Sequence, residues 1–225
     1  MSEHPVLKPF WQMSSQFELC AESWAVLGVP MKYRHTFLET ILPNNDEQTN
    51  LMNTFNQILR GRRGAFVFVS GNKDTGKTLL GSALVNSCGR WSCCYDRETE
   101  RTFDYVPRFV SMQDLIDRIT SYRSTKDWYN EYANVCRVLV IDRWNMMDGR
   151  EAVTPAVKKR LEQMLKTRTD NGYITVPLSR LLWQDAYEQF TPYFREEMPE
   201  MYIRPLAYAY HDSSNPFHDD EVDYE

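Results

Sequence analysis

Apolar positions along the chain alternate between short continuous runs and longer stretches with helical spacing. The runs AFVFV (residues 65–69) and VLVI (138–141) are typical of strands buried on both faces. Within residues 46–60, apolar side chains such as Leu51 and Phe55 recur at steps of one, three and four, which predicts an amphipathic helix. The same reasoning predicts further strands at 108–110, 173–176 and 201–206, and further helices at 79–86, 112–122, 154–168, 179–190 and 192–198.

This alternation of strands and helices through residues 65–206 predicts an α/β fold, a three-layer sandwich with a mainly parallel sheet and helices on both faces. Several helix starts carry capping signals. Ser111 with Asp114 forms a capping box, Thr154 precedes a proline at the first helical position, and Ser179 is the predicted cap of the helix that follows it.

The chain of 225 residues is expected to hold one such domain, over residues 28–208. Residues 1–27 are aromatic-rich and weakly periodic, and form either a packed extension or an arm for a partner. Residues 209–225 are acidic and poor in apolar side chains, so we expect a disordered tail. Its histidines and aspartates are expected to be solvated rather than to hold a metal.

The net charge of −5 gives no support for nucleic-acid binding, which would need local basic patches. No apolar run approaches the roughly 18 residues of a spanning helix, so no membrane association is expected. The first residues lack a basic region followed by an apolar one, and we expect a cytoplasmic protein. The five cysteines are expected to be reduced, and their spacing does not suit a structural zinc site.

The sequence GNKDTGKT (residues 71–78) follows the first apolar run and precedes a predicted helix. It matches G-x-x-x-x-G-K-[ST], the phosphate-binding P-loop, in the strand-to-helix context that the motif requires. The glycines allow backbone N–H groups to approach a phosphate, and Lys77 adds a charge near the β and γ phosphates. We therefore expect ATP to be held by Gly71, Asn72, Lys73, Asp74, Thr75, Gly76, Lys77, Thr78 and Leu79.

Asp142 ends the second apolar run, at the carboxyl end of a buried strand, where open α/β sheets place their ligands. Together with the Thr78 hydroxyl it forms the predicted Mg²⁺ site, because both groups are hard oxygen ligands. The alternative interpretation is a buried strand that ends in Asp by chance, without a metal. The P-loop earlier in the chain favours the interpretation of Asp142 as a metal ligand.

Basic residues cluster at two places, at Arg60, Arg62 and Arg63 and on the helix that follows Thr154. The second group consists of Lys158, Lys159, Arg160, Lys166 and Arg168, predicted to lie mostly away from the helix's apolar side. A solvated surface is the expectation for both, and contact with nucleic acid is the alternative.

The order of these motifs resembles the DnaC/IstB-type ATPases, a branch of the AAA+ superfamily that includes bacterial and phage helicase loaders. The similarity covers residues 27–206 and five elements: the stretch LGVPMKYR, the helix before the first strand, the P-loop with its helix, the stretch RFVSMQDLIDRI, and VLVIDRW. It implies an AAA+-like P-loop ATPase in which Lys77 and Asp142 serve catalysis.

The chain departs from this family pattern at three points. Arg143 stands where the family has an acidic residue that polarises water. The polar run that senses the γ-phosphate is replaced by ITVPLS, with only Thr175 or Ser179 as candidates. Arg195 is the candidate for the family's catalytic arginine, which reaches a neighbouring subunit's nucleotide. Its position along the chain does not match the spacing of the family pattern. Nucleotide binding is expected, whereas hydrolysis is in doubt.

The resemblance implies a protein of DNA replication that uses Mg-ATP to control its binding to a replicative helicase, to single-stranded DNA or to both. It also implies that the protein can form an ATP-dependent homo-oligomer. A transposition-helper ATPase is one alternative, and a nucleotide-binding switch without hydrolysis is another. A kinase with a small acceptor bound by residues 88–130 is the remaining one, because P-loop folds host many functions.

Overall fold

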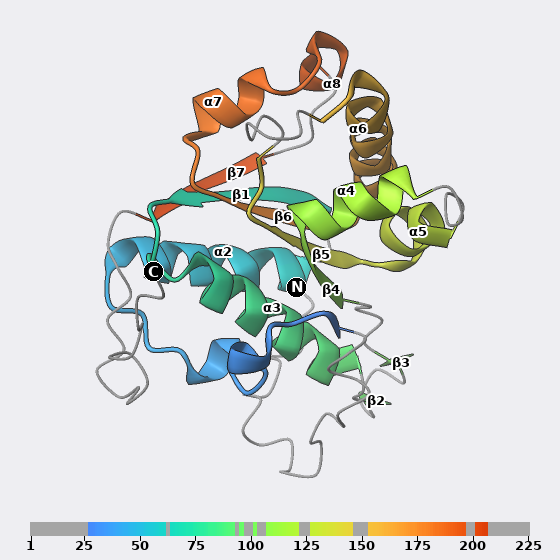
Figure 1. Ribbon diagram of the computed structural model, residues 1–225. Helices are drawn as coiled ribbons and strands as arrows, with labels where there is room; N and C mark the ends of the chain where they lie inside the picture. Colours follow the sequence, from blue (N-terminus) through green and yellow to red (C-terminus); the bar gives the residue numbers. More distant parts are fainter. Residues whose placement is uncertain are drawn as a thin grey trace, which may run out of the picture.

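The computed structural model (Figure 1) describes most of the predicted domain. The predictions for residues 1–26 and 207–225 lie outside the described residues. The described ranges are 27–61, 64–92, 95–96, 101–102, 107–121, 127–145, 153–196 and 201–206.

The centre of the structure is a five-stranded sheet whose pairings are all parallel, as predicted. The strand order is β4-β5-β6-β1-β7. Their bounds are β1 Ala65–Gly71, β4 Pro107–Ser111, β5 Val138–Asp142, β6 Ile174–Ser179 and β7 Met201–Leu206. Since parallel strands end at the same edge, β1, β5 and β6 bring their carboxyl ends together.

Helices cover both faces of this sheet (Figure 1), which confirms the predicted α/β sandwich. One face carries α2 (Asp46–Gly61) and α3 (Lys77–Ser92), with the short 3-10 turns η2 (Met31–Tyr33) and η3 (Leu38–Thr40) beside α3. The other face carries α4 Met112–Thr120, α5 Asp127–Tyr129, η4 Asn130–Val135, α6 Pro155–Asp170, α7 Trp183–Glu188 and α8 Pro192–Glu196.

Two hydrophobic cores fill the space between the layers, and β1 contributes to both. Val67 and Val69 pack with α2 and α3, whereas Phe66 and Phe68 pack into the opposite core, where Trp183 contacts Phe68 edge-on at 5.0 Å between ring centroids. This alternation follows from the two-residue period of a strand. It also explains why β1 has no polar face in the sequence.

Some predicted boundaries are confirmed and others are wrong. Ser111 accepts a hydrogen bond from the Asp114 N–H at 3.1 Å, and Thr154 caps α6. Ser179, however, is not a helix cap, because β6 continues through Pro177 and α7 begins only at Trp183. The residues of β6 are all buried, so packing on both faces outweighs the loss of one N–H donor at the proline.

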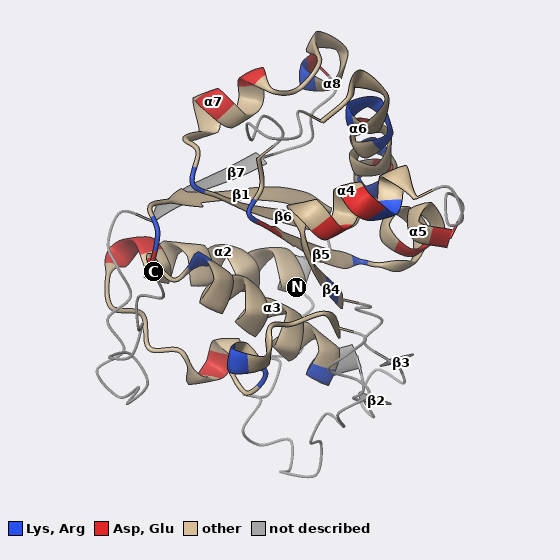
Figure 2. Cartoon of the chain, viewed as in Figure 1, with Lys and Arg blue, Asp and Glu red and all other residues tan. Residues whose placement is uncertain are grey.

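The P-loop helix is longer than predicted and reaches Ser92 instead of Asn86. The described part of the stretch after it forms a short antiparallel pair, β2 (Tyr95–Asp96) with β3 (Arg101–Thr102). Figure 2 shows basic residues concentrated along α6. One of them, Arg168, was predicted to lie outside the core but is fully buried.

The lead-in segment, which we define as residues 27–41, lies against β4 at Gly28 and then runs beside α3 (Figure 1). Gly28 adopts a φ of +75°, and a Cβ there would lie 2.2 Å from the carbonyl oxygen of Phe109 in β4. Only glycine satisfies both the left-handed conformation and this approach. The segment is thereby held against the edge strand before it reaches the carboxyl end of the sheet.

Candidate functional site: the phosphate-binding loop and its cavity

The loop between β1 and α3 has the backbone that its sequence predicts. Asp74 and Gly76 adopt φ values of +65° and +85°. Aspartate tolerates the left-handed region and glycine enters it without strain, so these residues turn the chain into α3. The helix then starts directly, since the Leu80 N–H donates to the Gly76 carbonyl at 2.9 Å. The N–H groups of Lys77, Thr78 and Leu79 come before this first helical bond, and N–H groups at such positions suit an anion.

The ammonium group of Lys77 is held inside this loop. It donates to the Gly71 carbonyl at 2.7 Å, to the Asn72 carbonyl, and to the Thr75 hydroxyl at 3.0 Å. Burial lowers the pKa of Lys77, and the nearby charge of Arg180 lowers it further. An anion bound in the loop would offset both effects, because it favours the charged form of the lysine.

Thr78 and Asp142 meet although 64 residues separate them in the chain. The Thr78 hydroxyl lies 3.3 Å from each carboxylate oxygen of Asp142. Burial raises the pKa of Asp142, and hydrogen bonds from the Arg143 backbone N–H and the Thr78 hydroxyl oppose that rise. A hydroxyl and a carboxylate at this separation fit a hard divalent cation such as Mg²⁺.

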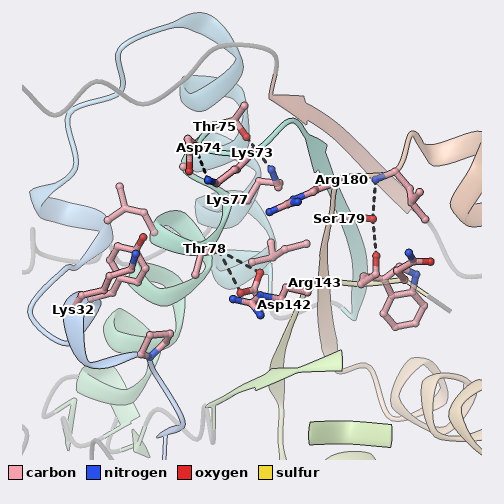
Figure 3. Close-up of a pocket in the computed structure, with 18 residues that line it drawn as sticks. Lys32, Lys73, Asp74, Thr75, Lys77, Thr78, Asp142, Arg143, Ser179 and Arg180 are labelled. Atoms are coloured by element: carbon pink, nitrogen blue, oxygen red, sulfur yellow. Dashed lines mark hydrogen bonds and ion pairs between the residues drawn. The ribbon is translucent and has the colours of Figure 1, made fainter. Parts of the chain in front are cut away.

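These groups open onto one cavity of about 670 Å³ (Figure 3). Its walls come from the P-loop, from the ends of β5 and β6, and from the lead-in segment through Pro30, Lys32 and Tyr33. In Figure 3, Lys32 and Arg180 lie on opposite sides of Thr78. The cavity therefore has a cationic phosphate end at the loop and a second end formed by the lead-in segment.

Two arginines add charge to the phosphate end. Arg143 follows β5 in a left-handed conformation with φ +56°, and Arg180 follows β6. Both line the cavity, and neither guanidinium group makes a hydrogen bond or ion pair with another of the described residues. Figure 3 shows Arg180 extending toward Lys77. Sequence reasoning missed Arg180 because it ended β6 at Val176 and placed a helix cap at Ser179.

The other predicted site residues occupy varied positions. Lys73, Asp74, Thr75, Gly76 and Leu79 line the cavity along with Lys77 and Thr78, whereas Gly71 and Asn72 contribute the carbonyl groups that hold Lys77. Thr175 lies away from the cavity and accepts a hydrogen bond from Arg168 at 2.8 Å. Ser179 lines the cavity, but its hydroxyl donates to the Trp144 carbonyl at 2.7 Å.

Arg195 does not line the cavity. It lies on α8, with its guanidinium carbon 5.4 Å from the centre of the Tyr187 ring. The role predicted for Arg195 is contact with the nucleotide of a neighbouring subunit. A single chain does not test that role, which stays a prediction.

Comparison with solved structures identifies the fold. A structure described as DnaI matches with a TM-score of 0.58 and 14% identity, over 81% of this chain and 96% of that one. A DnaC helicase loader matches with a TM-score of 0.54 and 18% identity, over 78% and 99%. AMPPCP-bound DnaA from Aquifex aeolicus matches at 0.59 and 15%, over 79% of this chain but 51% of that protein.

No family model and no curated protein matches the sequence. The chain shares the fold of these solved structures, so the resemblance found in the sequence is confirmed at the level of the fold.

Within the described part of the chain, no helix combines the length and the apolar content that a membrane crossing would need. The same residues contain no group of three or more His, Cys, Asp or Glu side chains placed to hold a metal ion. Cys93 and Cys94, two of the five cysteines, lie outside the described residues. The Thr78–Asp142 pair stays a predicted metal site, with the Thr78 hydroxyl 3.3 Å from each carboxylate oxygen.

Asp142→Asn is expected to stabilise the fold while weakening magnesium-dependent nucleotide binding. The raised pKa means that folding disfavours the charged carboxylate, so the stability that Asp142 contributes in its protonated form is lost as pH rises through its folded pKa. The melting temperature of Asp142→Asn should exceed that of the wild type at pH 7, and the difference should shrink in acid. Asp185→Asn, on an exposed turn of α7, is the control and should change little.

Proposed function

We propose that this protein binds Mg-ATP and uses it to control its binding to a replicative helicase, to single-stranded DNA or to both during DNA replication in the cytoplasm. The observation that carries the proposal is the single cavity that joins Lys77, the Thr78–Asp142 pair and the backbone of the P-loop. The fold supports it, since the similar structures include a helicase loader and a DnaA with single-stranded DNA.

Each residue has a distinct part in the proposed binding. Lys77 neutralises phosphate charge, and the backbone of residues 74–78 surrounds the phosphates. Thr78 and Asp142 would hold the metal, which would supply positive charge next to the phosphates. Arg195 is proposed to act at the nucleotide of a second copy in an ATP-dependent homo-oligomer.

The direct test is to measure nucleotide affinity and ATP turnover on one sample, with and without single-stranded DNA. A replicative helicase is then tested for retention on the immobilised protein with ATP, with ADP and without nucleotide. Nucleotide-dependent retention of helicase or DNA supports the proposal. Retention of a transposase in place of a helicase would favour the transposition-helper alternative, and absence of nucleotide binding would refute both.

A second candidate function is a nucleotide-binding switch without hydrolysis, and Arg143 is the observation that favours it. At the end of β5, beside Asp142, the site places a guanidinium group instead of a carboxylate that could accept a proton from water. Among the residues lining the cavity, the acids are Asp74 and Asp142, and Asp142 is engaged with Thr78. This arrangement suits retention of ATP better than its cleavage.

Arg143→Glu is expected to raise ATP turnover about tenfold or more, because a positioned general base contributes roughly 10²–10⁴ in rate. The measurement is phosphate release under saturating Mg-ATP. Arg137→Glu makes the same charge change at the exposed, opposite end of β5 and should leave turnover unchanged. If the wild type already hydrolyses ATP rapidly and Arg143→Glu slows it, the switch hypothesis is wrong.

A further inference from the structure

Helix α3 carries three polar side chains that are completely buried, namely Ser82, Asn86 and Ser87. Buried polar groups are costly unless they form hydrogen bonds, so such a set on one helix needs an explanation. Within the described residues, the Ser82 hydroxyl has no hydrogen-bond partner. Asn86 and Ser87, in contrast, are both bonded to the lead-in segment.

The amide group of Asn86 donates to the carbonyl of Tyr33 at 2.8 Å and to that of Thr36 at 2.7 Å, with the Arg34 carbonyl at 3.4 Å. Ser87 continues the connection, since its hydroxyl accepts from the Leu38 N–H at 3.0 Å and donates to Glu39 at 2.7 Å. These bonds join residues about 50 positions apart. They fix the turn that carries Lys32 and Tyr33 to the side of α3.

The same helix begins at Lys77, in the phosphate-binding loop, nine residues before Asn86. At 1.5 Å per residue, about 13 Å of rigid helix therefore connects the phosphate end of the cavity to the attachment point of its other wall. The lead-in segment contributes Pro30, Lys32 and Tyr33 to that wall, with the Lys32 ammonium group 4.9 Å from the centre of the Tyr33 ring.

We propose that Asn86 is a positioning residue that holds the Lys32–Tyr33 wall in place for the nucleoside half of the ligand, the base and ribose. The inference rests on the proposed nucleotide binding and adds a role for a residue that touches no ligand. Asn86 lies outside the cavity lining and acts through the backbone of residues 33–36. The phosphate half of the site does not depend on it, because the P-loop contacts are made within residues 71–78.

The test compares the dissociation constants of ATP and inorganic tripolyphosphate, which lacks the nucleoside. In Asn86→Ala, ATP affinity should fall about tenfold, the effect of losing one or two hydrogen bonds, while tripolyphosphate affinity stays within about twofold. Ser82→Ala is the matched control on the same buried helix face. Since no described residue bonds to the Ser82 hydroxyl, both affinities should be unchanged.

Equal losses for both ligands in a folded Asn86→Ala, or no loss for either, would overturn the inference. If Asn86→Ala does not fold, Ser87→Ala takes its place, with an expected threefold loss for ATP alone and the same criteria. Failure of the proposed function looks different, because the wild type would then bind neither ATP nor tripolyphosphate.

Discussion

Lys77→Ala should lower ATP affinity about 100-fold or more and leave the fold intact. Charge-assisted hydrogen bonds contribute roughly 1.5–3 kcal/mol each, and the lysine is expected to contact two phosphates. The side chain is half-buried and bonds only to its own loop, through the Gly71 and Asn72 carbonyls and the Thr75 hydroxyl. Titration calorimetry gives the affinity, and a thermal melt verifies folding.

Lys73→Ala is the matched control, because it removes the same charge from the same loop. The Lys73 side chain is 62% exposed and lies 4.0 Å from the Asp74 carboxylate. Such exposed pairs contribute little, so ATP affinity should change only a few-fold. If a folded Lys77→Ala binds ATP as tightly as the wild type, or if both variants lose affinity equally, the loop is not the specific phosphate site described above.

Arg168→Met should destabilise the protein by about 4 kcal/mol or more, because buried acceptors left without a donor cost roughly 1–3 kcal/mol each. Arg168 is fully buried near the end of α6. It donates to the Thr175 hydroxyl at 2.8 Å, to the Cys136 and Ile174 carbonyls at 2.5 Å, and to the Tyr132 carbonyl. One guanidinium group thus joins α6, η4 and the start of β6.

Chemical denaturation provides the free energy of unfolding for this variant. Lys159→Met makes the same kind of change at an exposed position of α6 and should stay within about 0.5 kcal/mol of the wild type. Thr175→Val is the milder test if Arg168→Met does not fold, and should cost about 1–2 kcal/mol by leaving one donor unpaired. A folded Arg168→Met as stable as the wild type would show that these carbonyls are satisfied in another way.

The conformation of the P-loop could be predicted from the sequence because its determinants are local. A strand, a loop with fixed glycines and a helix are consecutive in the chain, and Lys77 bonds within six residues of itself. The same holds for the caps at Ser111 and Thr154, whose bonds reach three residues along the chain. Local steric and hydrogen-bonding rules are sufficient for such features.

Contacts between distant segments were not predictable with the same certainty. Arg168 has the sequence environment of a surface residue, and only the packing of α6 on η4 and β6 buries it. Ser179 looked like a helix cap because Pro177 appeared to end the strand, yet burial on both faces extends β6 to Ser179 and brings Arg180 to the cavity. In both cases tertiary packing outweighs local propensity.

By itself, then, the sequence determined that this protein has a parallel α/β fold with a phosphate-binding loop, because hydrophobic period and loop chemistry are encoded residue by residue. The sequence also predicted that Asp142 lies beside Thr78, but only the tertiary structure decided which further distant groups share the cavity. The strand order places Arg180 near Lys77, and the bonds of Asn86 bring the lead-in segment to the opposite wall. These contacts depend on how the strands are ordered, which no local pattern specifies.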